Sequence, residues 1–129
     1  MLIVIPGRQT SWNAIYSSRS YWTRKILVDA AHEVIKGRLL EMGIMPNRDK
    51  NLFKNKVDID ITAYFKHHAQ DSDNIPDKLI IDALKGYLLI DDNIKYVGRV
   101  STESVIDEYE RIEISISESP CARKRHNLF

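Results

Sequence analysis

The sequence predicts a two-layer α+β domain in which helices pack on one face of a mixed β-sheet. One observation is the order of the local patterns, which runs strand, helix, strand, helix, strand, strand along the chain. A second is the length of 129 residues, which suits one domain that buries roughly two thirds of its unfolded surface. The third is an ordinary globular composition, with 43% hydrophobic and 29% charged residues. We therefore expect one folded domain over residues 1–118 and a basic, mobile tail over residues 119–129.

The first two predicted elements are a short buried strand and a long amphipathic helix. Leu2–Ile5 is a continuous apolar run that ends at Pro6-Gly7. A helix is predicted from about Ser20 to Met42, because apolar residues recur there at helical spacing. The residues of this stripe are Leu27, Ala31, Ile35, Leu39 and Met42. Gly43 ends the helix, and His32 is expected at its surface or rim.

The clearest strand pattern in the chain lies at Lys56–Lys66. Its apolar positions alternate and should face the core; they are Val57, Ile59, Ile61, Ala63 and Phe65. Asp58 and Asp60 point the other way and form a candidate metal-binding pair. Alternation already explains both as part of a solvated strand face, and we interpret them in that way.

A second, shorter helix and two further strands complete the predicted domain. The helix runs from about Pro76 to Lys85, and Gly86 is its stop signal. Ile94–Ser101 and Arg111–Ser117 have strand patterns, and the stretch Thr102–Asp107 between them has the composition of a turn.

Two acidic pairs flank the second helix. Asp71 and Asp73 precede it, and Asp91 and Asp92 follow it. Carboxylates from two separated points suit a hard cation such as Mg²⁺, and Lys78 beside them would steady the charge that develops on a phosphate under attack. The simplest alternative is that the first pair serves the helix N-terminus and the second a turn. The joint pattern favours metal-dependent chemistry at phosphodiester bonds, provided that the segment after the helix folds back across it.

Charge is distributed unevenly along the chain, although the net charge is only +1. Residues 1–66 hold 11 Lys or Arg against 6 Asp or Glu, whereas residues 67–118 hold 5 against 12. Three further cations lie at positions 123–125. An acidic centre between basic arms suits a nuclease, because a metal neutralises the centre while the arms hold phosphates. The alternative is that these charges mix once the chain folds.

A polar loop that follows the first strand combines basic and aromatic residues. Its candidate DNA-binding residues are Arg8, Trp12, Asn13, Tyr16 and Arg19. Cations interleaved with aromatic rings are typical of segments that hold a nucleic-acid backbone and stack on unpaired bases. The two aromatic rings are equally compatible with a role at the edge of the core.

Membrane and compartment signals are few. No apolar run approaches the length of a membrane span, and Leu2–Ile5 is too short for a signal peptide, so we expect no membrane partner. Cys121 is the one cysteine and cannot form an internal disulfide, which fits a reducing cytoplasm.

The stretch from Asp71 to Asp92 resembles the signature of the RusA family of Holliday junction resolvases. The matching residues are Asp71, Asp73, Asn74, Lys78, Asp82-Ala83-Leu84, Gly86 and Asp91-Asp92. Ser11-Trp12-Asn13 followed by Tyr16 resembles the N-terminal segment of the family less specifically, and the resemblance covers most of residues 1–117. The family usually has two residues between the asparagine and the lysine, whereas this chain has the three residues Ile75 to Asp77. An extra residue inside the helix would rotate the lysine by about 100° relative to the carboxylates.

This resemblance implies a structure-specific endodeoxyribonuclease of bacterial or phage origin. Such an enzyme would act as a homodimer in recombination and repair and cut four-way DNA junctions by paired nicks with Mg²⁺ or Mn²⁺. The implied metal ligands are Asp71, Asp73 and Asp92. Lys78 would contact the scissile phosphate or the nucleophile, and the implied supporting groups are Asn74, Asp82 and Asp91. Two alternatives stay open: a protein that binds branched DNA without cutting it, and a metal-dependent nuclease of other specificity.

Overall fold

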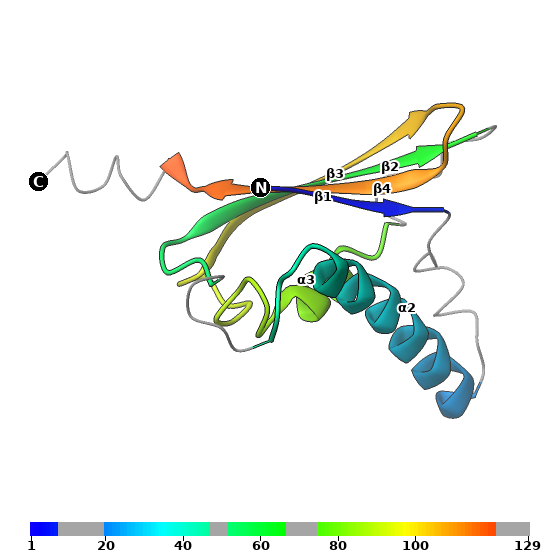
Figure 1. The fold of residues 1–129 in the computed structure, drawn as a ribbon, viewed down its shortest axis with the longest axis horizontal. Coiled ribbons are helices and arrows are strands. Elements are labelled where there is room, and N and C mark those ends of the chain that lie inside the picture. Colours follow the sequence, from blue (N-terminus) through cyan, green and yellow to red (C-terminus); the bar gives the residue numbers. More distant parts are fainter. Residues whose placement is uncertain (8–19, 47–51, 67–74, 121–129) are drawn as a thin grey trace, which may run out of the picture.

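The computed structural model describes residues 1–7, 20–46, 52–66 and 75–120 of the chain (Figure 1). The elements in these ranges are β1 (Leu2–Pro6), α2 (Tyr21–Glu41), β2 (Val57–Phe65), α3 (Asp77–Leu84), β3 (Val97–Ile106) and β4 (Arg111–Glu118). The predicted α+β class, with a mixed sheet of four strands and two helices, is confirmed for the described part of the chain, as is the order of the elements.

The sheet has the strand order β1-β4-β2-β3. β4 pairs antiparallel with both β1 and β2, whereas β2 and β3 are parallel. A parallel pair cannot be closed by a tight turn, and α3 lies in the long connection that joins these two strands. Ile3, Ile114 and Ile61 stand opposite one another in register, so one row of buried side chains crosses three strands.

Both helices lie on the same side of the sheet in Figure 1. The hydrophobic core lies between this helical layer and the sheet. The five apolar positions predicted for the inner face of β2 are all buried, as are Ile112, Ile114 and Ile116 of β4. α3 buries Leu79, Ile80, Ile81, Ala83 and Leu84, so only a narrow stripe of this short helix meets solvent. Each large aliphatic side chain removed from water stabilises the fold by about 1.5–3 kcal/mol.

The long helix agrees with its predicted bounds to within one residue at each end. Gly43 follows it with a φ of +81°, a conformation that favours glycine, and its N–H donates to the carbonyl of Leu40. Arg38 fixes the helix to the sheet, because its Nε donates to the carbonyl oxygen of Val4 at 2.8 Å. No helix in the part of the chain that the structure describes is both long and apolar enough to cross a membrane.

The predicted turn at Thr102–Asp107 is wrong, because β3 continues through this stretch to Ile106. Thr102 to Ile106 stand in register with Ile61 to Phe65 of β2, so their backbone groups are satisfied by the sheet despite a polar sequence. The start of the strand was also misplaced. Ile94 is 85% exposed, and the strand begins only at Val97, whose N–H donates to the carbonyl of Asn93.

The interpretation of Asp58 as a solvated residue is also wrong. Only 9% of it is exposed, and its Oδ1 accepts a hydrogen bond from the backbone N–H of Arg99 at 2.8 Å. The register between β2 and β3 shifts at this point, between Val57 and Ile59. Asp58 therefore bonds a backbone N–H of β3 where the strand pairing is irregular. Asp60 remains partly exposed and accepts a hydrogen bond from the Ser101 hydroxyl.

Candidate functional site

Three charged side chains from the predicted site line one pocket. The pocket has a volume of about 360 Å³ and is lined by Lys78, Ile81, Asp82 and Asp92. Lys78 and Asp82 lie four residues apart on α3, so they occupy the same face of that helix. Ile81 is buried and supplies apolar surface. The pocket thus combines one cation and two carboxylates beside an apolar wall.

The start of α3 explains why Lys78 faces the pocket. The helix begins at Asp77, and Pro76 is its N-cap residue. Of the three residues that precede Lys78, Ile75 and Pro76 therefore lie before the helix and Asp77 is its first residue. Lys78 consequently shares the exposed stripe of the helix with Asp82, while the buried residues of the helix face the core.

A tight return after α3 carries the second acidic pair back to the helix. Gly86 has a φ of +84°, and its N–H donates to the carbonyl of Leu89 at 2.8 Å. Leu88 and Leu89 are buried, which holds the returning segment against the core. The segment then reaches Asp92 at the pocket. The structure thus returns Asp92 to the helix, whereas Asp71, towards which the sequence pattern required it to fold, lies outside the described residues.

Asp82 and Asp92 form a carboxyl pair at the pocket. Partial burial of the Asp82 carboxyl raises its pKa above the ordinary value, and the hydrogen bond and negative charge of Asp92 raise it further. His32 and Lys85 act in the opposite direction on the same pKa. A negative charge beside a carboxyl group disfavours its ionised form, and a bound cation relieves this repulsion. The pair therefore fits a hard divalent cation, whose preferred ligands are carboxylate oxygens.

Asp91 stabilises the returning turn. Its Oδ1 accepts the backbone N–H of Asp92 at 2.8 Å, and its Oδ2 accepts the side-chain amide of Asn93 at 3.2 Å. Lys85 Nζ lies 3.3 Å from its Oδ1. The pKa of Asp91 is lowered, first by the hydrogen bond from the Asp92 N–H, then by the Asp92 side chain and by Lys85. Asp91 thus remains ionised and holds the backbone that presents Asp92.

His32 joins α2 to the helix that carries the site. Its Nε2 lies 3.1 Å from the carbonyl oxygen of Leu79, and because a carbonyl only accepts, this nitrogen carries the hydrogen. The ring is half-buried, which agrees with its expected place at the helix rim, but its contact with α3 was not predicted. The one signal in the sequence is that His32 adjoins Ala31 on the buried stripe of α2.

The other predicted site residues lie outside the described residues. They are Asp71, Asp73 and Asn74 of the acidic stretch, and Arg8, Trp12, Asn13, Tyr16 and Arg19 of the N-terminal loop. The N-cap position of α3 is occupied by Pro76, which makes no side-chain cap hydrogen bond. Within the described ranges, no group of three or more His, Cys, Asp or Glu side chains is arranged to hold a metal.

Comparison with models of known protein families gives no match to this sequence. Comparison with curated proteins gives no significant match either.

Proposed function

We propose that this protein is a Mg²⁺-dependent endodeoxyribonuclease of the RusA type, which resolves four-way DNA junctions. The observation that supports this proposal is the convergence of Lys78, Asp82 and Asp92 on one pocket. These residues come from two segments separated by a turn, and each belongs to the motif that resembles the RusA signature. In this proposal the fold is also RusA-like, with a helical layer packed on one face of the sheet.

Asp92 would hold the metal together with Asp71 and Asp73, which precede α3 in the sequence. Mn²⁺ would serve as well as Mg²⁺, because both accept oxygen ligands. When bound, the cation would lower the pKa of a water molecule and neutralise charge on the phosphate. The carboxyl pair of Asp82 and Asp92 at one pocket supports this assignment, because a cation relieves the mutual repulsion of two carboxylates.

The remaining residues of the site orient groups and balance charge. Lys78 is exposed at the same pocket, where its ammonium group would contact a non-bridging phosphate oxygen and stabilise developing negative charge. Asp82 would support Asp92 from the same side of the pocket. Asp91 would fix the backbone of Asp92 through the returning turn, and Asn74 would support Asp73.

The basic N-terminal half of the chain would bind DNA and position it at this pocket. The proposed contacts are Arg8, Trp12, Asn13, Tyr16 and Arg19. Two copies of the chain would form a symmetric dimer, so that each junction meets two sites. A bacterial or phage protein of this kind would work in the cytoplasm, in recombination and repair.

The proposal is tested with three labelled DNA substrates: a four-way junction, a flap and a plain duplex, each with and without Mg²⁺. The expected result is Mg²⁺-dependent nicking of the junction at two related positions, with little cutting of the duplex. Asp92→Asn should abolish nicking. Asp60→Asn is the matched control, because Asp60 lies on the strand face opposite the core residues of β2 and lines no part of the pocket. Preferential cutting of the flap would contradict the proposed specificity, and absence of metal-dependent cutting would contradict the proposed chemistry.

A further inference from the structure

The first turns of α2 carry a patch of exposed aromatic and aliphatic side chains. Tyr21 is 66% exposed, Trp22 is 68% exposed and Ile26 is 66% exposed. Together with Lys25 they stand at positions i, i+1, i+4 and i+5, which lie on one side of a helix. We call these four residues the aromatic–basic face of α2. Single exposed apolar residues are common on protein surfaces, but a contiguous group on one helical face marks an interaction site.

The aromatic–basic face has internal order. The rings of Tyr21 and Trp22 meet edge to face, with centroids 5.5 Å apart and an interplanar angle of 73°. Lys25 Nζ lies 5.9 Å from the centroid of the Trp22 ring. These contacts hold the indole ring in place while most of its surface remains in water. The face is therefore arranged before any ligand arrives.

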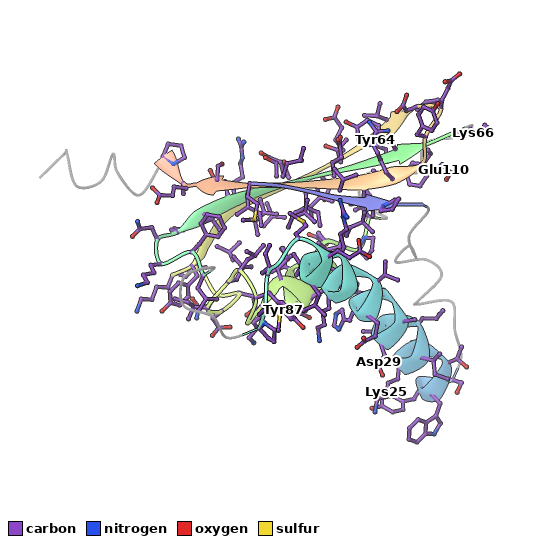
Figure 2. The ribbon with its side chains drawn as sticks, in the orientation of Figure 1. Lys25, Asp29, Tyr64, Lys66, Tyr87 and Glu110 are labelled. Atoms are coloured by element: carbon purple, nitrogen blue, oxygen red, sulfur yellow. The ribbon has the colours of Figure 1, made fainter. Side chains whose placement is uncertain are left out.

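This face lies on the part of α2 that extends beyond the sheet. In Figure 1 the start of the helix is far from the four strands, and in Figure 2 Lys25 lies at that end of the molecule while Tyr64 and Lys66 lie at another. The first residue of α2 that is buried in the core is Ala31. Packing of the described core therefore does not require large apolar side chains at the start of the helix.

The charge of the same turns points to an anionic ligand. Arg24 and Lys25 both lie there, and the first turn contains no acidic residue. Cations near the N-terminus of a helix oppose its dipole, and Ser20 makes no side-chain hydrogen bond as the N-cap. The start of this helix is therefore less stabilised than it would be with acidic residues and a side-chain cap.

We infer that the aromatic–basic face of α2 docks unpaired nucleotides of branched DNA, an inference that rests on the proposed function. The Trp22 and Tyr21 rings would stack on bases that have left the duplex, and Arg24 and Lys25 would contact the adjoining phosphates. Six residues of helix span about 9 Å, so the face suits a short unpaired stretch near the branch point.

The acidic residues that follow on α2 argue against a membrane as the ligand. Asp29 and Glu33 lie seven and eleven positions after Trp22, which places them on the same helical stripe. A helix lying on an anionic membrane would bring both carboxylates to the lipid surface, where they would be repelled. A short unpaired stretch of nucleotides over residues 21–26 would lie on the N-terminal side of both carboxylates.

The test measures binding affinity in the absence of divalent metal, so that no cleavage occurs. The probes are a four-way junction with unpaired bases at its centre, the same strands as plain duplex, and phosphatidylserine vesicles. Trp22→Ala should weaken junction binding about tenfold, which corresponds to about 1.4 kcal/mol, and change duplex binding less than about twofold. Trp22→Phe should retain affinity within about threefold, because a ring remains to stack. Tyr109→Ala is the matched control, since Tyr109 is 74% exposed and lies outside the aromatic–basic face.

The outcomes separate this inference from the proposed function. Unchanged junction affinity in Trp22→Ala, with normal affinity in the wild type, would overturn the inference alone. A wild-type protein that binds no branched DNA would overturn both. Loss of vesicle binding or of self-association in Trp22→Ala, with junction affinity intact, would assign the face to lipid or to a second copy instead. Circular dichroism of each variant verifies that α2 is intact, and Trp22→Phe provides the comparison if the alanine variant unfolds.

Discussion

Asp82 of α3 and Asp92, ten positions later in the chain, line the same pocket. They are brought together because the segment after α3 reverses at Gly86 and buries Leu88 and Leu89. The pair shares its pocket with Lys78, which supplies a positive charge. Partial burial and the negative charge of Asp92 disfavour the ionised form of Asp82 and raise its pKa. This raised pKa gives the first prediction.

In the absence of metal, the free energy of unfolding should fall as the pH rises through the elevated pKa of Asp82. The folded protein has the higher pKa, so between the unfolded and folded values it binds more protons than the unfolded chain, and raising the pH favours unfolding. Asp82→Asn should weaken this dependence and stabilise the protein at neutral pH by less than about 1 kcal/mol, because the pair is exposed to water. Urea unfolding between acidic and neutral pH measures both effects. A wild-type stability that rises over this range, with no difference from Asp82→Asn, would contradict the prediction.

Removing any proposed metal ligand should abolish cleavage while leaving junction binding equal or tighter. The variants are Asp71→Asn, Asp73→Asn and Asp92→Asn, and each removes a negative charge that repels phosphate. Nicking assays with Mg²⁺ and binding assays without it give the two quantities. Asp60→Asn should behave as the wild type in both. Full cleavage by any two of the three variants would rule out this ligand set.

Lys78→Ala should slow cleavage by roughly 10²–10³-fold with little loss of junction affinity. The reason is that a cation acting on developing charge stabilises the transition state more than the bound substrate. Single-turnover rates at saturating protein isolate this step. Lys95→Ala is the matched control, because Lys95 is an exposed lysine outside the pocket. Small and equal losses of rate and affinity in Lys78→Ala would instead identify Lys78 as an ordinary surface cation.

The sequence predicted the elements whose apolar residues recur on one face. It missed features that depend on pairing with a neighbouring strand. The bounds of α2, β2 and α3 were predicted to within a residue or so, because apolar periodicity records burial directly. β3 was cut short because Thr102 to Ser104 are polar, and only their pairing with β2 makes this stretch a strand. Its position at the sheet edge permits such a composition.

The sequence predicted the part of the candidate site that depends on helical spacing, but not the part that depends on tertiary contacts or burial. Motif residues on α3 were identified correctly as neighbours, since helical spacing places Lys78 and Asp82 together. The contact between Asp82 and Asp92 depends on the tertiary turn at Gly86, and spacing alone did not establish it. The burial of Asp58 was missed because alternation gives the direction of a side chain but not what covers it.

Gly98→Ala should destabilise the protein by about 1–3 kcal/mol. A Cβ added at Gly98 would lie 2.6 Å from Oδ1 of Asp58, whose carboxylate is buried and bonded to the N–H of Arg99. Gly37→Ala is the matched control, because a Cβ there meets nothing within 4 Å and the residue lies inside α2. That change should stabilise the protein by up to about 1 kcal/mol. Thermal and urea unfolding report both values, and equal effects of the two substitutions would contradict the Asp58 contact.

The proposed nuclease should work as a symmetric dimer. Resolving a four-way junction requires two related cuts, and each chain carries one set of the proposed ligands, so a two-fold axis is the simplest way to present two sites. Sedimentation equilibrium at micromolar concentration should show a dimer. When wild-type and Asp92→Asn chains are mixed in equal amounts and allowed to exchange, about half of the dimers should be mixed, and these should nick only one strand of a junction. Denaturing gels of a doubly labelled junction distinguish single from paired nicks. A protein that stays monomeric when bound to a junction, or mixtures that give only paired cuts, would show that paired cleavage does not arise from two linked sites.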